Sequence, residues 1–249
     1  MKFIMKKEYL FIAIILLFGQ ITFCQTAVSG KIDNYTGKDA DIIINPLFPE
    51  TLGKINTEGE FTANFDGSSY TRMEKIIGES QKKETGRMNF STLKKFQTRY
   101  KCEDDSFSFT NSEQPYTQLL GAIGFIVGNL KSNEVNGIIK VVNSKDFGGS
   151  QVFNPQNDPI VGYLLDWYYV EKATKVDGNC SKTMSTGEGD ETYDWNIKIE
   201  LDFQPGWNLV QYEISKVFTG KAGDKFIQNA SYSSLDKVPE DVKYIYSKK

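Results

Sequence analysis

The chain has 249 residues and a formal net charge of −3, with 29 basic residues against 32 acidic ones. This length suffices for one large or two small domains with a hydrophobic core, and the acidic balance argues against nucleic acids and anionic membrane surfaces as partners. The sequence contains no histidine. Catalysis by Ser-His-Asp or Cys-His groups is therefore excluded, and the commonest zinc ligand is missing.

The first residues are typical of a secretory signal peptide. A basic start with Lys2, Lys6 and Lys7 precedes the apolar run 10–18, which is too short to span a bilayer as a helix. Small residues at positions 22 and 24 predict that residues 1–24 are cleaved off after Cys24. We therefore expect an extracytoplasmic protein, located in the periplasm, at the cell surface or outside the cell. No later apolar run is long enough to predict a transmembrane helix in the mature chain.

Two alternatives to simple export stay open. The leader would act as a membrane anchor if it were not cleaved. Cys24 would carry a lipid if the chain were a bacterial lipoprotein, and one acyl chain would then attach it to a membrane surface. Lipidation generally requires a small residue before the cysteine, and Phe23 occupies that place.

The residue pattern of segment 25–66 predicts N-terminal strands separated by turns. The runs 28–32, 41–45, 52–55 and 60–65 are apolar or alternating and are bounded by Gly, Asn, Asp or Pro. Within the last run, Phe61, Ala63 and Phe65 alternate and so share one face of a strand. About 40 residues cannot bury a core by themselves, so these strands must pack against later parts of the chain.

Residues 67–100 predict a partly helical insertion. Met73, Ile76 and Ile77 have helical spacing, and a second short helix is indicated around 90–96. Residues 79–87 between them are polar and indicate an exposed loop.

Residues 101–249 return to a strand pattern and predict a C-terminal antiparallel region. Segments 120–130 and 135–142 predict one hairpin, and 160–170 is expected to pair with 173–176. Segment 194–203 alternates strictly, and a Gln-Pro-Gly turn separates it from 207–214, so these two are expected to form another hairpin. The predicted fold class is mainly β, an antiparallel β-sandwich with a short helical insertion.

Several segments together resemble uncharacterised secreted proteins and putative lipoproteins of the Bacteroidetes. They are VSGKI, LGKINTEGEF, KCEDDSFSFTN, VGYLLDWYYVEKATKVDGNC, IELDFQPGWNLVQYEI and VPEDVKYIY, and together they cover much of the mature chain. The resemblance implies a β-sandwich opening similar to a carboxypeptidase-regulatory or transthyretin-like domain. It implies no activity and transfers no functional residue.

Few residues suggest chemistry, and no cofactor motif is present. Cys102 and Cys180 are able to pair in an oxidising compartment, although two separate thiols are the alternative. Glycoside hydrolysis needs only two carboxylates, and candidates on or beside the predicted strands are Asp166, Glu171, Asp194, Glu200 and Asp202. The acidic loop 188–194 offers oxygen ligands to calcium but lacks EF-hand spacing. A solvated surface is the favoured interpretation of these carboxylates.

Aromatic residues make up 13% of the chain and concentrate in its C-terminal half. Trp167, Tyr168 and Tyr169 are the candidate ligand-facing rings, because exposed rings stack on sugars or anchor protein partners. Buried rings would instead form the β core. The sequence therefore predicts a non-catalytic exported module that binds a protein or glycan partner at the cell envelope. The alternative is a carboxylate-dependent enzyme acting on glycans.

Overall fold

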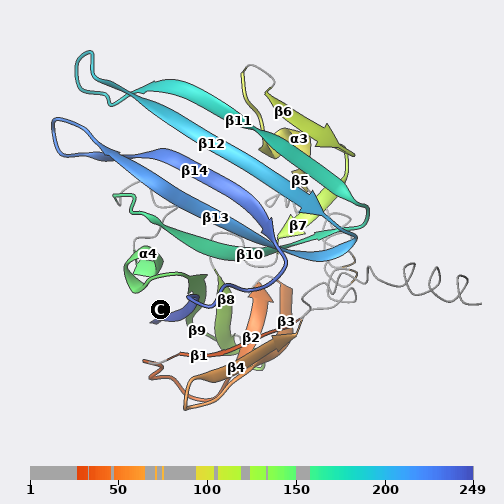
Figure 1. Ribbon diagram of the computed structural model, residues 1–249. Coiled ribbons are helices and arrows are strands. Elements are labelled where there is room, and N and C mark those ends of the chain that lie inside the picture. The colour runs from red at the N-terminus through yellow and green to blue at the C-terminus, as the bar shows by residue number, and fades with distance from the viewer. Residues whose placement is uncertain are drawn as a thin grey trace, which may run out of the picture.

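The structure is a computed structural model that describes residues 27–32, 34–45, 48–64, 71, 75, 94–103, 106–118, 124–132, 134–149 and 158–248. The predicted leader 1–24 and most of the predicted insertion 67–100 lie outside these residues. Thr71 and Lys75 are helical, and the second predicted helix overlaps the short helix α3 only at Phe96. The described chain is mainly β, as expected, and its strands form one continuous, mostly antiparallel sheet (Figure 1).

The first half of this sheet combines the N-terminal strands with three later ones. Strand order runs β1, β4, β3, β2, β8 and β9, and β15 also pairs with β9. These strands are β1 (Ala27–Lys31), β2 (Ala40–Asn45), β3 (Phe48–Ile55), β4 (Glu60–Asn64), β8 (Phe125–Asn129), β9 (Glu134–Val142) and β15 (Lys243–Lys248). We call this part the N-terminal half-sheet. It confirms the four predicted N-terminal strands and the predicted hairpin of β8 and β9.

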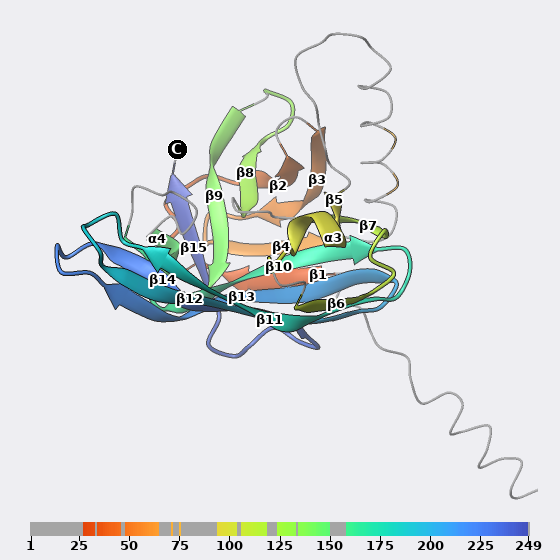
Figure 2. The same ribbon diagram turned by 90° about the horizontal axis from the view of Figure 1, so that it is seen from above.

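The second half consists of longer strands in the order β10, β13, β14, β12, β11 and β6, and we call it the broad half-sheet. Its strands are β10 (Gly162–Val170), β13 (Gly206–Thr219), β14 (Lys225–Leu235), β12 (Thr192–Phe203), β11 (Thr174–Ser185) and β6 (Phe107–Thr110). The remaining elements are β5 (Lys94–Lys95), α3 (Phe96–Arg99), β7 (Pro115–Gln118) and α4 (Lys145–Gly149). Figure 2 shows α3, β5 and β7 together on one side of the broad half-sheet.

The N-terminal half-sheet packs against the broad half-sheet in one hydrophobic cluster. Ile42 and Phe61 from the first meet Trp167 and Leu209 from the second, and all four are nearly inaccessible to water. This packing confirms that the N-terminal strands bury their apolar face against later parts of the chain. Removal of apolar side chains from water provides the main stabilisation at such a contact.

A second cluster fills the space between α3 and the opposite face of the broad half-sheet. Phe96 and Tyr100 pack there on Leu201, Phe203 and Tyr168. Since consecutive strand residues point to opposite faces, β10 contributes to both clusters. The sheet is therefore buried on both faces at β10.

The predicted hairpin between 194–203 and 207–214 is wrong. Strand β14 lies between these segments, parallel to β12 and antiparallel to β13, so that Tyr232 has Ile199 on one side and Tyr212 on the other. The strand after the Gln-Pro-Gly turn pairs with β10 and continues to Thr219 before the chain returns as β14. Alternation identifies the faces of a strand but does not specify its neighbours.

The predicted pairing of 160–170 with 173–176 is also wrong. Strand β10 pairs with β13, β7 and β9, whereas β11 pairs with β12 and β6. The chain leaves the middle of the sheet after Val170 and re-enters near its far edge. The polar stretch 181–193 is mostly the tip of the β11–β12 hairpin, with Ser185 opposite Thr192.

The two half-sheets are parts of one sheet, so the separate layers of the predicted β-sandwich are not shown. A ladder contact between Leu164 and Val142 joins β10 to β9, so the two half-sheets are hydrogen-bonded to each other. No helix among the described residues is long and apolar enough to cross a membrane.

Candidate functional site

A cleft of about 770 Å³ lies on the exposed face of the N-terminal half-sheet. Strands β2, β3, β4 and β8 form its floor, and the turns after β3 and β8 contribute to its walls. The charged side chains that line it are Asp39, Asp41, Lys54, Glu60 and Lys131. The lining is therefore hydrophilic, in contrast to the apolar cluster beneath the same strands.

Register places three polar residues in one row across the cleft floor. Thr62 of β4 is opposite Lys54 of β3, which is opposite Asp41 of β2. The next position in the row is Gly128 of β8, where a Cβ atom would lie 2.2 Å from the carbonyl oxygen of Glu134. The residues that alternate with this row, such as Ile42, point into the core. A regular alternation of apolar and polar residues thus produces both the core and the cleft.

The cleft carboxylates are held by groups of their own chain. Asp39 Oδ1 accepts a hydrogen bond of 2.9 Å from the main-chain N–H of Thr57, and Asp41 Oδ2 accepts one of 3.3 Å from Leu130. Glu60 Oε2 accepts from Asn56 Nδ2 at 3.0 Å. These bonds attach the surrounding turns to the strands and fix the shape of the cleft walls.

The two cleft lysines differ from the cleft carboxylates in their interactions with the rest of the chain. Among the described residues, the ammonium groups of Lys54 and Lys131 form no ion pair or hydrogen bond, and both residues are exposed. The main-chain N–H of Lys131 donates to Asn129 Oδ1 at 2.9 Å, which positions the residue at the cleft wall. The site therefore offers two cationic groups whose charge is not neutralised by a described side chain.

The three predicted ligand-facing rings are not on an open surface. Trp167 is 0% exposed and Tyr168 is 1% exposed, because each lies in one of the two core clusters. Tyr169 is half-buried and packs edge-on against Trp207, with ring centroids 5.3 Å apart. Trp167 and Tyr168 therefore do not face a ligand and belong to the β core, which is the alternative interpretation of these aromatic residues.

The carboxylates singled out from the sequence do not line the cleft. Asp166 is buried at 3% exposure and accepts a hydrogen bond from the N–H of Trp167. The other four, Glu171, Asp194, Glu200 and Asp202, are exposed. Glu200 pairs with Lys198 at 2.8 Å, as expected of a solvated sheet face.

In the acidic loop 188–194, Glu191 acts as a hydrogen-bond acceptor. Its carboxylate accepts from the main-chain N–H of Lys221 at 3.1 Å, which joins the tip of the β11–β12 hairpin to the tip of the β13–β14 hairpin. Within the described parts of the chain, no group of three acidic or cysteine side chains is arranged to hold a metal ion.

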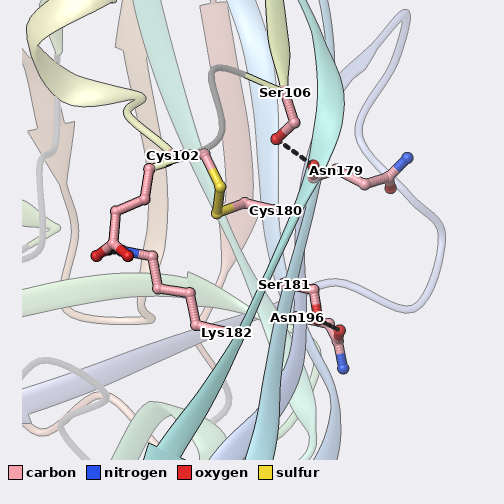
Figure 3. The surroundings of a disulfide bond; sticks show 8 residues. Cys102, Ser106, Asn179, Cys180, Ser181, Lys182 and Asn196 are labelled. Carbon is pink, nitrogen blue, oxygen red and sulfur yellow. Dashed lines mark hydrogen bonds and ion pairs between the residues drawn. A yellow bond between two sulfur atoms is a disulfide. The ribbon is translucent and has the colours of Figure 1, made fainter.

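A disulfide joins Cys102 to Cys180 and closes a loop with a sequence separation of 78 residues (Figure 3). It attaches the segment after α3 to β11. Two further contacts support the same junction: Ser106 Oγ donates to the carbonyl of Asn179 at 2.5 Å, and Glu103 pairs with Lys182 at 2.6 Å. The bridge therefore fastens α3 to the broad half-sheet.

Sequence reasoning missed a buried cationic cluster under α3. The Arg99 guanidinium carbon lies 5.6 Å from the ring centroid of Tyr100, 5.7 Å from that of Tyr232 and 6.0 Å from that of Tyr168. Such distances are typical of cation–π interactions. The rings come from separate elements, so no local pattern could have revealed the cluster.

Burial strongly affects the tyrosines of this cluster. It raises the pKa of Tyr116 to about 12, although Arg99 acts in the opposite direction, and it raises the pKa of Tyr100 and Tyr168 as well. The phenols therefore stay protonated and neutral at physiological pH. Perturbed groups often mark functional sites, but here they lie in the core and outside the cleft.

Comparisons with known proteins give no further guidance to function. No protein-family model, no curated protein and no solved structure matches this chain.

Proposed function

We propose that the mature chain is an exported, non-catalytic protein of the cell envelope or extracellular space that binds a hydrophilic partner in the cleft of the N-terminal half-sheet. The observation that carries this proposal is the cleft itself, a cavity of about 770 Å³ with charged and amide side chains along a regular sheet face. Concave sites with convergent polar groups are the usual places of ligand binding.

Export is supported by the leader-like residues 1–24 and by the Cys102–Cys180 disulfide. Disulfides form and persist mainly in oxidising compartments. Cys180 is 1% exposed, whereas Cys102 is half-buried. Together these features favour the periplasm, the cell surface or the exterior over the cytosol.

A binding role is favoured over a catalytic one by the state of the cleft carboxylates. Asp39 and Asp41 each accept a hydrogen bond from a main-chain N–H group of a neighbouring turn, which fixes the orientation of both carboxylates. The cleft acids therefore serve to hold its walls.

The β-sandwich is proposed as the architectural description of this body. The two half-sheets pack face to face in one apolar cluster, and a single register pair, Leu164 with Val142, joins β10 to β9. Two sheet layers around a common core are the basis of sandwich folds. A likeness to the secreted Bacteroidetes proteins named above is compatible with this arrangement and belongs to the same proposal.

A second candidate function is a carboxylate-dependent enzyme acting on glycans. It is favoured by the presence of Asp39, Asp41 and Glu60 in one cleft. Incubation with polysaccharides and measurement of new reducing ends tests it. Hydrolysis that disappears in Asp41→Asn or Glu60→Gln would establish the enzyme, whereas binding without hydrolysis supports the first proposal.

The binding proposal is tested by capture from an envelope fraction with tagged mature protein. Thr62→Tyr places a ring in the centre of the cleft floor, while Thr183→Tyr makes the same change on an exposed position of β11. Protein or polysaccharide retained by the wild type and Thr183→Tyr, but not by Thr62→Tyr, supports the cleft. Equal retention by all three, or none by the wild type, contradicts it. Circular dichroism verifies that both variants fold.

A further inference from the structure

The charged groups of the cleft differ in whether they already have a partner. Each of the three carboxylates accepts a hydrogen bond on one oxygen, from an N–H group of Thr57, Leu130 or Asn56. The two ammonium groups, on Lys54 and Lys131, have no partner among the described residues. An incoming ligand therefore finds two ammonium groups without a described partner and three carboxylates that already accept at least one hydrogen bond each.

We propose that the cleft binds an acidic oligosaccharide, whose carboxylate or sulfate groups pair with Lys54 and Lys131. This inference rests on the proposed binding function and names the class of ligand. Ammonium groups form charge-assisted hydrogen bonds with either kind of anion. The lining holds three acidic and two basic side chains, so the cleft as a whole is not positively charged. The acidic ligand is attracted by ion pairs with the two lysines.

The other polar side chains of the cleft match sugar hydroxyls. Thr62, Asn64 and Asn129 line it, and hydroxyl and amide groups both donate and accept hydrogen bonds. Sugar hydroxyls have the same double capacity. The ladder places Thr62 beside Lys54, so a hydroxyl group and an acidic group of one sugar ring are able to bind neighbouring side chains.

A protein partner is disfavoured by the absence of an apolar anchor in the described lining. Protein interfaces depend on a few aromatic, arginine or aliphatic residues that fill desolvated pockets. The large apolar residues that border the cleft are Ile55 and Phe61, and these are 1% and 3% exposed because they point into the core. The accessible surface is mainly polar, which suits a hydrated sugar chain.

The test measures binding of the mature protein to polygalacturonate, dextran sulfate and neutral dextran by affinity electrophoresis at low and moderate salt. The double variant Lys54→Gln, Lys131→Gln is compared with Lys172→Gln, Lys175→Gln, which removes the same charge from exposed lysines of the broad half-sheet. We expect an acidic polymer to be bound by the wild type and the control. The cleft double variant should bind about five- to ten-fold more weakly, as the loss of two exposed ion pairs implies.

The polymer that is bound separates the two anion sources: polygalacturonate indicates carboxylates and dextran sulfate indicates sulfates. The inference is overturned if neutral dextran binds equally well, or if both double variants lose the same affinity. It is also overturned if no polymer binds although Thr62→Tyr abolishes capture of an envelope component, and the proposed function then survives. Absence of both polymer binding and cleft-dependent capture removes the two together.

Discussion

Arg99 shows how one residue organises the interior of the broad half-sheet. Its guanidinium lies over rings of α3, β10 and β14, so it connects three elements that are far apart in sequence. Burial opposes its charge, whereas the surrounding tyrosines favour it, and the pKa of Arg99 is raised as a result. The group therefore stays cationic in the folded protein.

Arg99→Met is expected to lower the free energy of unfolding by about 2–4 kcal/mol, because the buried tyrosines lose the cation that lies over their rings. Lys95→Met is the control, since Lys95 is exposed and its ion-pair partner among the described residues is the exposed Glu113. It should change stability by less than about 1 kcal/mol. Urea unfolding followed by tryptophan fluorescence measures both. Equal effects would contradict a structural role for Arg99.

Tyr116 gives a prediction for alkaline pH. Burial raises its pKa from 10.0 to about 12 in the folded protein, so the folded state favours the protonated phenol. The resulting stabilisation is complete below pH 10 and is lost as the pH rises through 12. The melting temperature should therefore fall steeply between these values, and tyrosinate absorbance should appear together with unfolding. Full ionisation of the tyrosines in a still-folded protein would contradict this.

At the scale of elements, α3 depends on covalent attachment. It has four residues and no side-chain hydrogen bond at its N-cap. A helix of four residues is too short to be stable by itself. Packing of Phe96 in the core and the disulfide after the helix hold it on the sheet.

Removal of the disulfide by Cys102→Ala, Cys180→Ala should cost about 4 kcal/mol, which the chain-entropy model gives for a closed loop of this length. Thermal or urea unfolding under oxidising conditions measures the loss. Addition of a thiol reductant should destabilise the wild type but leave the double variant unchanged. If complete reduction leaves the stability of the wild type unchanged, α3 does not need the disulfide to stay on the sheet.

The floor of the cleft requires a glycine at position 53 of β3. A Cβ atom at this position would lie 1.7 Å from the carbonyl oxygen of Thr62 on β4, and main-chain atoms cannot move aside without breaking the β3–β4 ladder. Gly53→Ala should therefore cost at least about 2 kcal/mol and weaken ligand binding in the cleft.

Gly149→Ala is the matched control for this change, because a Cβ atom there would meet nothing within 4 Å. It should alter stability by less than about 1 kcal/mol. Calorimetry of the two variants provides the comparison, and equal melting temperatures would show that β3 and β4 tolerate the side chain.

At the scale of the whole molecule, the continuous sheet predicts a gradient of local stability. Strand β13 has hydrogen-bonded neighbours on both sides, whereas β1 lies at the end of the strand order. Central strands open mainly by global unfolding, while edges open locally. Amide exchange in Val210–Ile214 should be at least about 100-fold slower than in Ala27–Lys31. Equal rates would mean that the sheet opens as one unit.

The alternation of apolar and polar residues predicted many of the strands, such as β4 and β12, and the apolar face of each, but it did not predict β14. Phe61 and Ala63 alternate in the sequence and are buried together in the structure, because the two-residue period of a strand is a local property. The same alternation places Thr62, the polar residue between them, on the opposite face of the strand. Absence of histidine likewise limits catalytic chemistry at the level of composition.

Tertiary structure alone decided which strands are neighbours and which groups meet. Insertion of β14 between β12 and β13, the gathering of tyrosines around Arg99 and the cleft formed by Asp41, Lys54 and Thr62 all join residues from separate segments. The burial of Trp167 and Tyr168 on opposite faces of β10 also depends on what covers each face. Pairing follows from the burial of the whole apolar surface, which is a property of the complete chain and of no single segment.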